Sequence, residues 1–247
     1  ENLILNCNNN AQSGFDSLVM GSSLRMKHVR AYDALQDGLV INYYSCVIEK
    51  SGAYRSGRHN IRTTDGTTSV VMVQAMSGDI DHADASIKIG RTHYSTLISP
   101  FVDGANLGIE YGDPLLSYAM SLTIIEPGFE NIGTCIRANN SSLTITGGTI
   151  FNVRAANYRF EFTNSTVTIG SQWYRRADHA ALTGALNLYS ITGGETTFIK
   201  SVPSSWITSA NSPDIKMPVP TAISAKTLYI NNSTGNDNNI GGTVGTA

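Results

Sequence analysis

The tetrad Ser121-Leu122-Thr123-Ile124 returns as Ser142-Leu143-Thr144-Ile145 and again as Thr166-Val167-Thr168-Ile169. Counted between their second residues, the three copies lie 21 and then 24 residues apart. In each copy branched apolar residues alternate with hydroxyl residues, which is the period-two pattern of a strand with one buried face. A repeat of this length built from strands predicts a solenoid, because each coil buries its apolar face only by stacking on the next.

Related segments extend this repeat toward the N-terminus, with anchors at residues 3, 24, 46, 70, 97, 122, 143 and 167. A second strand is expected in each coil, as in Ser86-Ile87-Lys88-Ile89 and Tyr158-Arg159-Phe160-Glu161-Phe162. Alternation places the isoleucines and phenylalanines of these two segments inward, and Lys88 and Glu161 outward. The sequence therefore predicts an all-β fold, a parallel β-helix of about eight coils.

The repeat weakens after residue 175, and this suggests three regions. Residues 1–175 are expected to form the β-helix, and residues 176–226 an irregular, β-rich closing region with a proline-containing linker. Residues 227–247 read as the start of a further β module that is cut short. The N-terminal strand has no cap in the sequence, so we expect the chain to be part of something longer.

The composition argues against several classes of function. The 17 basic and 19 acidic residues give a formal charge of −2, so the sequence offers no electrostatic basis for binding nucleic acid or a membrane surface. No apolar run approaches the ~18 residues of a membrane-spanning helix. The three cysteines are far apart, and we expect reduced thiols, with Cys7 and Cys46 as small buried residues. No metal site or cofactor is expected.

The coil period and phrases such as Asp37-Gly38-Leu39-Val40-Ile41-Asn42, where a loop ends in glycine and enters an inward strand, resemble a known family. The family is that of right-handed parallel β-helices of the pectate-lyase type, especially those of bacteriophage tailspikes and tail fibres. The resemblance covers roughly residues 1–175. It implies an extracellular virion protein, a parallel homotrimer that contacts other tail proteins, and a bacterial surface polysaccharide as its ligand.

Cleavage of a polysaccharide by hydrolysis needs two carboxyl groups. Asp103 and either Glu126 or Glu130 lie at similar offsets from successive anchors, so stacking of the coils could bring Asp103 close to one of the glutamates, and we expect the pair to be Asp103 and Glu126. Asp79 and Asp81 form a second candidate pair, because they share one face of an extended segment. Either set of carboxylates has an ordinary alternative interpretation, as solvated turn residues or as outward groups that keep a solenoid soluble.

Candidate residues for binding a sugar chain are basic or aromatic. The stretch from Tyr54 to Arg62 is the most concentrated positive segment, and its Arg55, Arg58 and His59 could hold an acidic sugar. The same residues could instead pair with Asp65 or with a neighbouring chain. Tyr54, Tyr94 and Trp173 could stack on sugar rings, or they could cover the edges of the solenoid.

These observations favour a tailspike or tail-fibre body that binds a capsule or O-antigen and cleaves it as an endo-glycosidase. Two alternatives stay open. The chain could be a structural or receptor-binding segment of a virion fibre without enzymatic activity. It could also be a secreted polysaccharide lyase, in which a basic residue abstracts the proton next to a uronate carboxylate.

Overall fold

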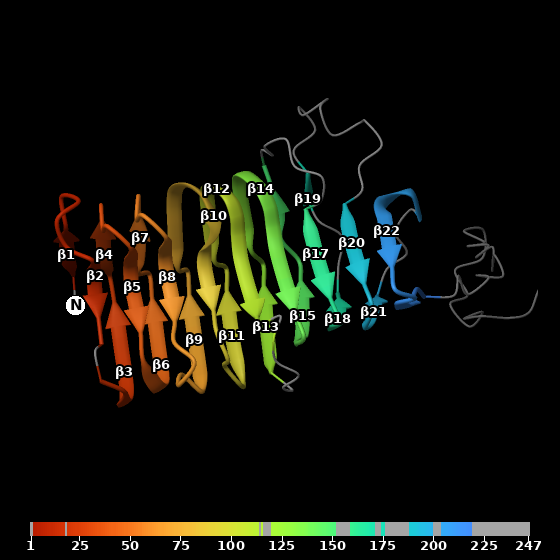
Figure 1. Cartoon of the computed structure of the whole chain (residues 1–247), viewed down its shortest axis with the longest axis horizontal. Coiled ribbons are helices and arrows are strands. Elements are labelled where there is room, and N and C mark those ends of the chain that lie inside the picture. Colours follow the sequence, from red (N-terminus) through yellow and green to blue (C-terminus); the bar gives the residue numbers. More distant parts are fainter. Residues whose placement is uncertain are drawn as a thin grey trace, which may run out of the picture. The chain divides into compact units, whose positions relative to one another are not determined.

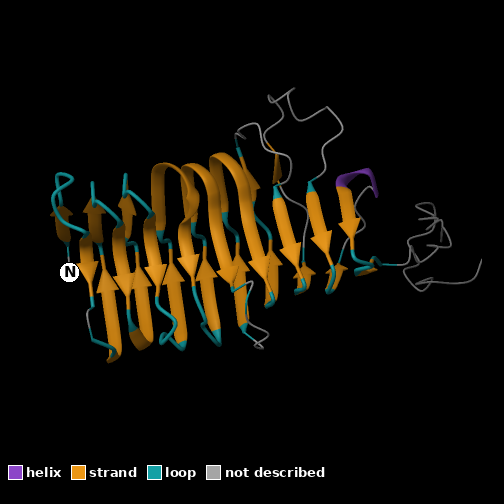
Figure 2. Ribbon diagram, viewed as in Figure 1, coloured by secondary structure: helices purple, strands orange, loops and turns teal. Residues whose placement is uncertain are grey.

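The computed structural model of the chain is an all-β protein built from stacked parallel strands (Figure 2). It describes residues 2–17, 19–113, 115, 120–151, 159–170, 174–175, 188–199 and 204–218, without the side chains of 79–83, 174–175 and 205. Residues 1–217 form one compact unit and residues 218–247 a second one. Trp173, part of the predicted closing region and the predicted module at 227–247 lie outside the described residues.

Three ladders of parallel strands run side by side along the first unit, and each forms one lateral face of a solenoid (Figure 1). Face 1 is a sheet of nine strands. Its members are β3 (Gly21–Lys27), β6 (Tyr43–Glu49), β9 (Ser69–Val73), β11 (Ser95–Ile98), β13 (Ser121–Ile125), β15 (Ser142–Thr146), β18 (Thr166–Ile169), β21 (Glu195–Phe198) and β23 (Asp214–Lys216).

Face 2 and face 3 belong to one sheet, because three long strands cross from one face to the other. The long strands are β10 (Met76–Ile89), β12 (Phe101–Gly112) and β14 (Gly128–Asn139). Face 2 consists of β1 (Leu3–Asn6), β4 (Val29–Tyr32), β7 (Gly52–Tyr54), the first parts of the long strands, β16 (Thr149–Ile150) and β19 (Tyr174–Arg175). Face 3 consists of β2 (Ser13–Asp16), β5 (Asp37–Ile41), β8 (His59–Thr63), the second parts of the long strands, β17 (Phe160–Thr163), β20 (Tyr189–Thr192) and β22 (Ile207–Ala210).

The stack makes a parallel β-solenoid of about six turns, counted from β3–β5 to β15–β17. Shorter strands continue the ladders beyond these turns as far as Lys216, and the only helical element among the described residues is the 3-10 turn η2 (Ser204–Trp206). The predicted boundary at residue 175 lies between β19 and β20.

The inward residues of successive coils stack on one another along the solenoid. On face 3, Ile61, Ile87, Ile109 and Ile136 are register partners from coil to coil, and all four are fully buried. Burying one such side chain contributes about 1.5–3 kcal/mol. Ile87, Phe160 and Phe162 point inward as the alternation predicted, while Lys88 and Glu161 are partly exposed.

Two details of the predicted repeat are wrong. The sequence suggested two strands per coil, but three of the six turns have three, because segments of three or four residues such as Val29–Tyr32 and Gly52–Tyr54 form face 2 as separate strands. Residue 3, the first predicted anchor, lies in β1 on face 2, whereas the other anchors lie on face 1. Leu97 pairs with Met72 and Ile124, so it is shifted by two residues from the anchors at 70 and 122.

Candidate functional site

One outward row on face 2 brings two tyrosines and two carboxylates into line. Register pairs join Tyr32 to Tyr54, Tyr54 to Gly78, Gly78 to Asp103 and Asp103 to Glu130. Each partner belongs to the next coil, and stacked strands lie about 4.8 Å apart, so the row extends over about 19 Å. We call these five residues the face 2 row.

The carboxylates Asp103 and Glu130 occupy the same position in β12 and β14. Both residues are half-buried, and Asn131 Nδ2 donates a hydrogen bond of 3.1 Å to Asp103 Oδ1. The residue after each carboxylate has a left-handed backbone, with φ of 63° at Gly104 and 53° at Asn131. This bend turns each long strand from face 2 into face 3, and it holds both carboxylates at the same edge of face 2.

Glu126, the other predicted partner of Asp103, lies elsewhere. It is exposed at the corner between β13 and β14, one residue beyond the register pair Ile98–Ile125, with φ of 49°. Its carboxylate lies against the corner at Gly147, where an added Cβ would be 2.2 Å from Oε1. The register therefore brings Asp103 together with Glu130 and leaves Glu126 on the next corner.

The aromatic end of the row is built by Tyr32 and Tyr54. Their rings stack with centroids 5.3 Å apart and planes 15° from parallel. The Tyr54 ring also lies close to Gly78, where an added Cβ would be 3.1 Å from Tyr54 Cδ1. Phe101, which is half-buried two residues before Asp103, adds a third ring to the same face.

Arg55 lies against the ring of Tyr32 and pairs with Asp33. Its Nε and Nη2 donate hydrogen bonds of 2.7 and 3.0 Å to the two carboxylate oxygens of Asp33, and its guanidinium lies 5.6 Å from the centre of the Tyr32 ring. The hydrogen bonds from Arg55 hold the pKa of Asp33 below its ordinary value. The predicted pairing of this basic segment with Asp65 is wrong for Arg55, whose carboxylate partner is Asp33.

Arg58 and His59 lie on face 3, around the buried carboxylate of Asp37. Arg58 donates two hydrogen bonds to that carboxylate, one of them 2.9 Å long from Nε to Oδ1, and Arg62 Nε lies 3.1 Å from Oδ2. Burial by itself would raise the pKa of Asp37, but the hydrogen bonds from Arg58 and the charges of both arginines outweigh it and lower the pKa. Arg58 is therefore bound to a carboxylate of its own chain.

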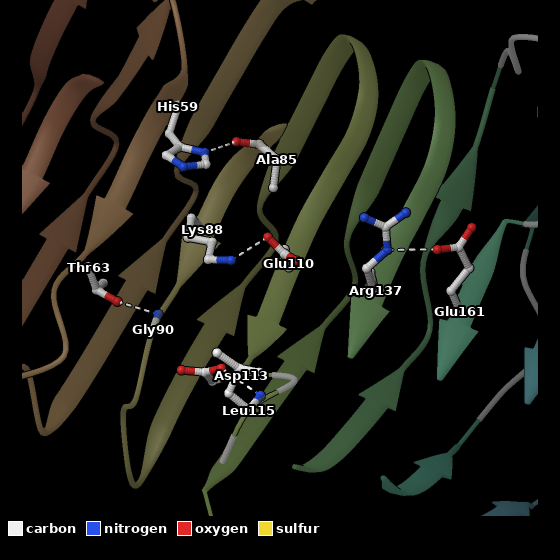
Figure 3. Close-up of polar contacts among 10 residues, drawn as sticks. All are labelled: His59, Thr63, Ala85, Lys88, Gly90, Glu110, Asp113, Leu115, Arg137 and Glu161. Atoms are coloured by element: carbon white, nitrogen blue, oxygen red, sulfur yellow. Dashed lines mark hydrogen bonds and ion pairs between the residues drawn. The ribbon is translucent and has the colours of Figure 1, made fainter. Parts of the chain in front are cut away.

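His59 is buried beside this cluster, and its Nδ1–H donates a hydrogen bond of 2.6 Å to the carbonyl of Ala85 (Figure 3). Burial lowers the pKa of His59, and the carbonyl of Ala85 and the charge of Asp37 oppose only part of this effect. The neutral imidazole thus ties β8 to β10, and it lies outside the face 2 row.

The outward side chains of face 3 pair along the solenoid axis. Lys88 binds Glu110, and Arg137 Nε donates a hydrogen bond of 2.7 Å to Glu161 (Figure 3). A hollow of about 410 Å³ next to Lys88 also contains Arg62. Both cations are already paired with carboxylates of the chain, so this hollow is a weaker candidate than the face 2 row.

The remaining predicted residues are not part of the row. Tyr94 is 80 % exposed at the corner before β11, with φ of 53°. Asp79 and Asp81 lie in β10, but their side chains, like Trp173, are outside the described residues. Sequence reasoning missed Tyr32 and Asn131; the 22-residue spacing of Tyr32 and Tyr54, which equals one coil, could have revealed the first of them.

Within the described ranges no group of three or more His, Cys, Asp or Glu is arranged to hold a metal ion. No helix in that part of the chain has the length and apolar composition needed to span a bilayer. No family model, no curated protein and no solved structure matches this chain.

Proposed function

We propose that this chain binds an extended bacterial surface polysaccharide along face 2 and hydrolyses it with Asp103 and Glu130. The observation that carries the proposal is the register pair of these two half-buried carboxylates, in the same outward row as the stacked Tyr32 and Tyr54. Aromatic rings offer an apolar surface to the C–H faces of sugars, and paired carboxyl groups supply the acid and the nucleophile or base of glycoside hydrolysis.

The spacing of the coils favours a retaining mechanism. Retaining glycosidases hold their carboxyl groups about 5–5.5 Å apart and inverting ones about 6.5–9.5 Å apart, while stacked strands are about 4.8 Å apart. Asp103, oriented by Asn131, attacks the anomeric carbon and forms a covalent glycosyl intermediate. Glu130 protonates the departing glycosidic oxygen and then removes a proton from the water that releases the sugar.

In this proposal the ligand lies along the face 2 row. This row, about 19 Å long, runs parallel to the solenoid axis, so several sugar residues contact the protein at once. Tyr32 and Tyr54 hold one end of the bound polysaccharide, while Asp103 and Glu130 act three and four coils away from Tyr32. Such an arrangement favours cleavage inside a polysaccharide over removal of its terminal sugar.

The setting that we propose is the body of a bacteriophage tailspike or tail fibre. The support for this setting is the resemblance of the coil period and of the Asp37–Asn42 segment to such proteins. The hydrolase proposal has two competitors, a structural or receptor-binding fibre segment without activity and a polysaccharide lyase. A structural segment would bind no polysaccharide, and the other candidates differ in what happens to the bound chain.

The test is incubation of the protein with purified capsules and O-antigens, followed by measurement of new reducing ends. Asp103→Asn and Glu130→Gln should each lower the release at least about 100-fold, since they remove a reacting carboxyl group. Glu126→Gln is the matched control and should keep full activity. Binding without release by the unaltered protein would instead identify a fibre segment, and a product with the ultraviolet absorption of an unsaturated uronate would identify a lyase.

A further inference from the structure

The outward side of face 1 carries no charge over five successive strands. Its central row consists of Val71, Thr96, Thr123, Thr144 and Thr168, which are register partners in β9, β11, β13, β15 and β18. All five side chains are half-buried and β-branched. Branching at Cβ restricts their rotamers, so covering them with another surface costs little side-chain entropy.

The rows on both sides of this central row are also uncharged. One side carries Val73, Ile98, Ile125 and Thr146. The other carries the hydroxyls of Ser69, Ser121, Ser142 and Thr166, with the exposed Tyr94 just before β11. The same coils place Lys88 and Glu161 on face 3, so the chain does have charged outward residues in this region. Depletion of charge with partly exposed apolar groups is the composition found at the centre of interfaces between proteins.

The two ends of this uncharged strip carry opposite net charges. Near its N-terminal end lie Arg25, Lys27 and Glu49, which sum to +1. Near its C-terminal end lie Glu195, Asp214 and Lys216, which sum to −1. Two copies stacked with parallel axes would bring like ends together, whereas antiparallel axes bring each positive end to a negative end.

We propose that face 1 is an interface between two copies of this chain, packed face to face with their solenoid axes antiparallel. Five to seven strands spaced about 4.8 Å apart, each about five residues long with a rise of about 3.3 Å per residue, cover an area of about 400–550 Å². Two such faces bury about 800–1,100 Å², near the lower limit for a specific interface. The pair is therefore expected to dissociate on dilution. β13 is the middle strand of the nine, so Thr123 of each copy lies near the two-fold axis.

This inference does not rest on the proposed glycan hydrolysis, and it departs from the parallel homotrimer that the family resemblance implies. Sedimentation velocity of the full chain over a range of concentrations tests it. The expected result is a reversible dimer. Thr123→Lys places two like charges near the axis and should raise the dissociation constant at least tenfold. Ser190→Lys, a similar change at an outward position of face 3, is the matched control and should leave the dissociation constant unchanged.

Charge reversal tests the orientation. Arg25→Glu alone makes both opposing ends net negative and should weaken the dimer, and adding Asp214→Lys should restore it. In a parallel pair the second change would bring no recovery. A monomer at every concentration, a trimer, a Thr123→Lys variant that associates as tightly as the unaltered chain, or no recovery in the double variant would each overturn the proposal.

Discussion

Asp37→Asn tests whether the buried carboxylate on face 3 stabilises the solenoid. The side chain of Asp37 is 2 % exposed, while those of Arg58 and Arg62 are 38 % and 34 % exposed. The asparagine has nearly the same shape but no charge, so two arginines of the adjacent coil lose their shared counterion. Breaking a fully buried pair costs about 3–5 kcal/mol. Since both guanidinium groups reach water, we expect a smaller loss of about 2–3 kcal/mol.

The loss should be visible in the melting temperature and in its dependence on pH. For a chain of this size, 2–3 kcal/mol corresponds to a fall of about 4–12 °C. The folded pKa of Asp37 lies below that of the unfolded chain, so its stabilisation is complete above the unfolded value of about 3.9 and is lost as the pH falls through the folded value. The two proteins should differ by a constant amount between pH 5 and 8 and converge in stronger acid.

Thermal unfolding followed by circular dichroism at pH 7 and pH 3 is the assay. Asp214→Asn is a suitable control, because Asp214 is 62 % exposed and its pair with Lys216 contributes at most about 1 kcal/mol. Equal melting temperatures of the Asp37→Asn variant and the unaltered protein at pH 7 would refute the reasoning. A difference that persists unchanged at pH 3 would show that the charge of Asp37 is not its cause.

Three further perturbations test other parts of the structure. Gly112→Ala should destabilise the protein by about 1–3 kcal/mol, because φ is +87° and the new Cβ would lie 2.0 Å from the Asn139 carbonyl; an unchanged melting temperature would contradict this. Tyr54→Ala should weaken polysaccharide binding in calorimetry about 2- to 10-fold, whereas Tyr54→Phe keeps the ring and should bind normally. Cys46 and Cys135 should react with a thiol reagent only after unfolding, since burial raises the pKa of each to about 12, and rapid reaction of both in the native protein would be the contrary result.

The fold could be predicted because the alternation of apolar residues and the coil period are both visible in the sequence. The register between neighbouring strands could not be predicted in this way. Ser95 and Leu97 point to the same side of β11, and only the ladder shows that Ser95 pairs with Leu122. A shift of one residue would expose the apolar set, whereas a shift of two keeps it buried, so the pattern cannot tell the two registers apart. Choosing the leucine as anchor produced the error.

The candidate site was predicted in part. Asp103 and Glu130 were both selected from their offsets, but the choice between Glu126 and Glu130 depended on the corner that places Glu126 between two faces. The stacking of Tyr32 on Tyr54 requires the face 2 ladder, whose short strands are not evident from the sequence. Short strands leave a weak periodic signal, because three residues hold only one or two inward positions.

The anomeric configuration of the first product tests the central claim most directly. Proton NMR of a sensitive polysaccharide, recorded in the first minutes of cleavage, shows whether the released sugar keeps the configuration of the glycosidic bond. Because Asp103 and Glu130 are register partners on strands about 4.8 Å apart, we predict retention, with no product from Asp103→Asn or Glu130→Gln. Inversion, or cleavage by either variant at the full rate, would contradict a reaction carried out by this pair.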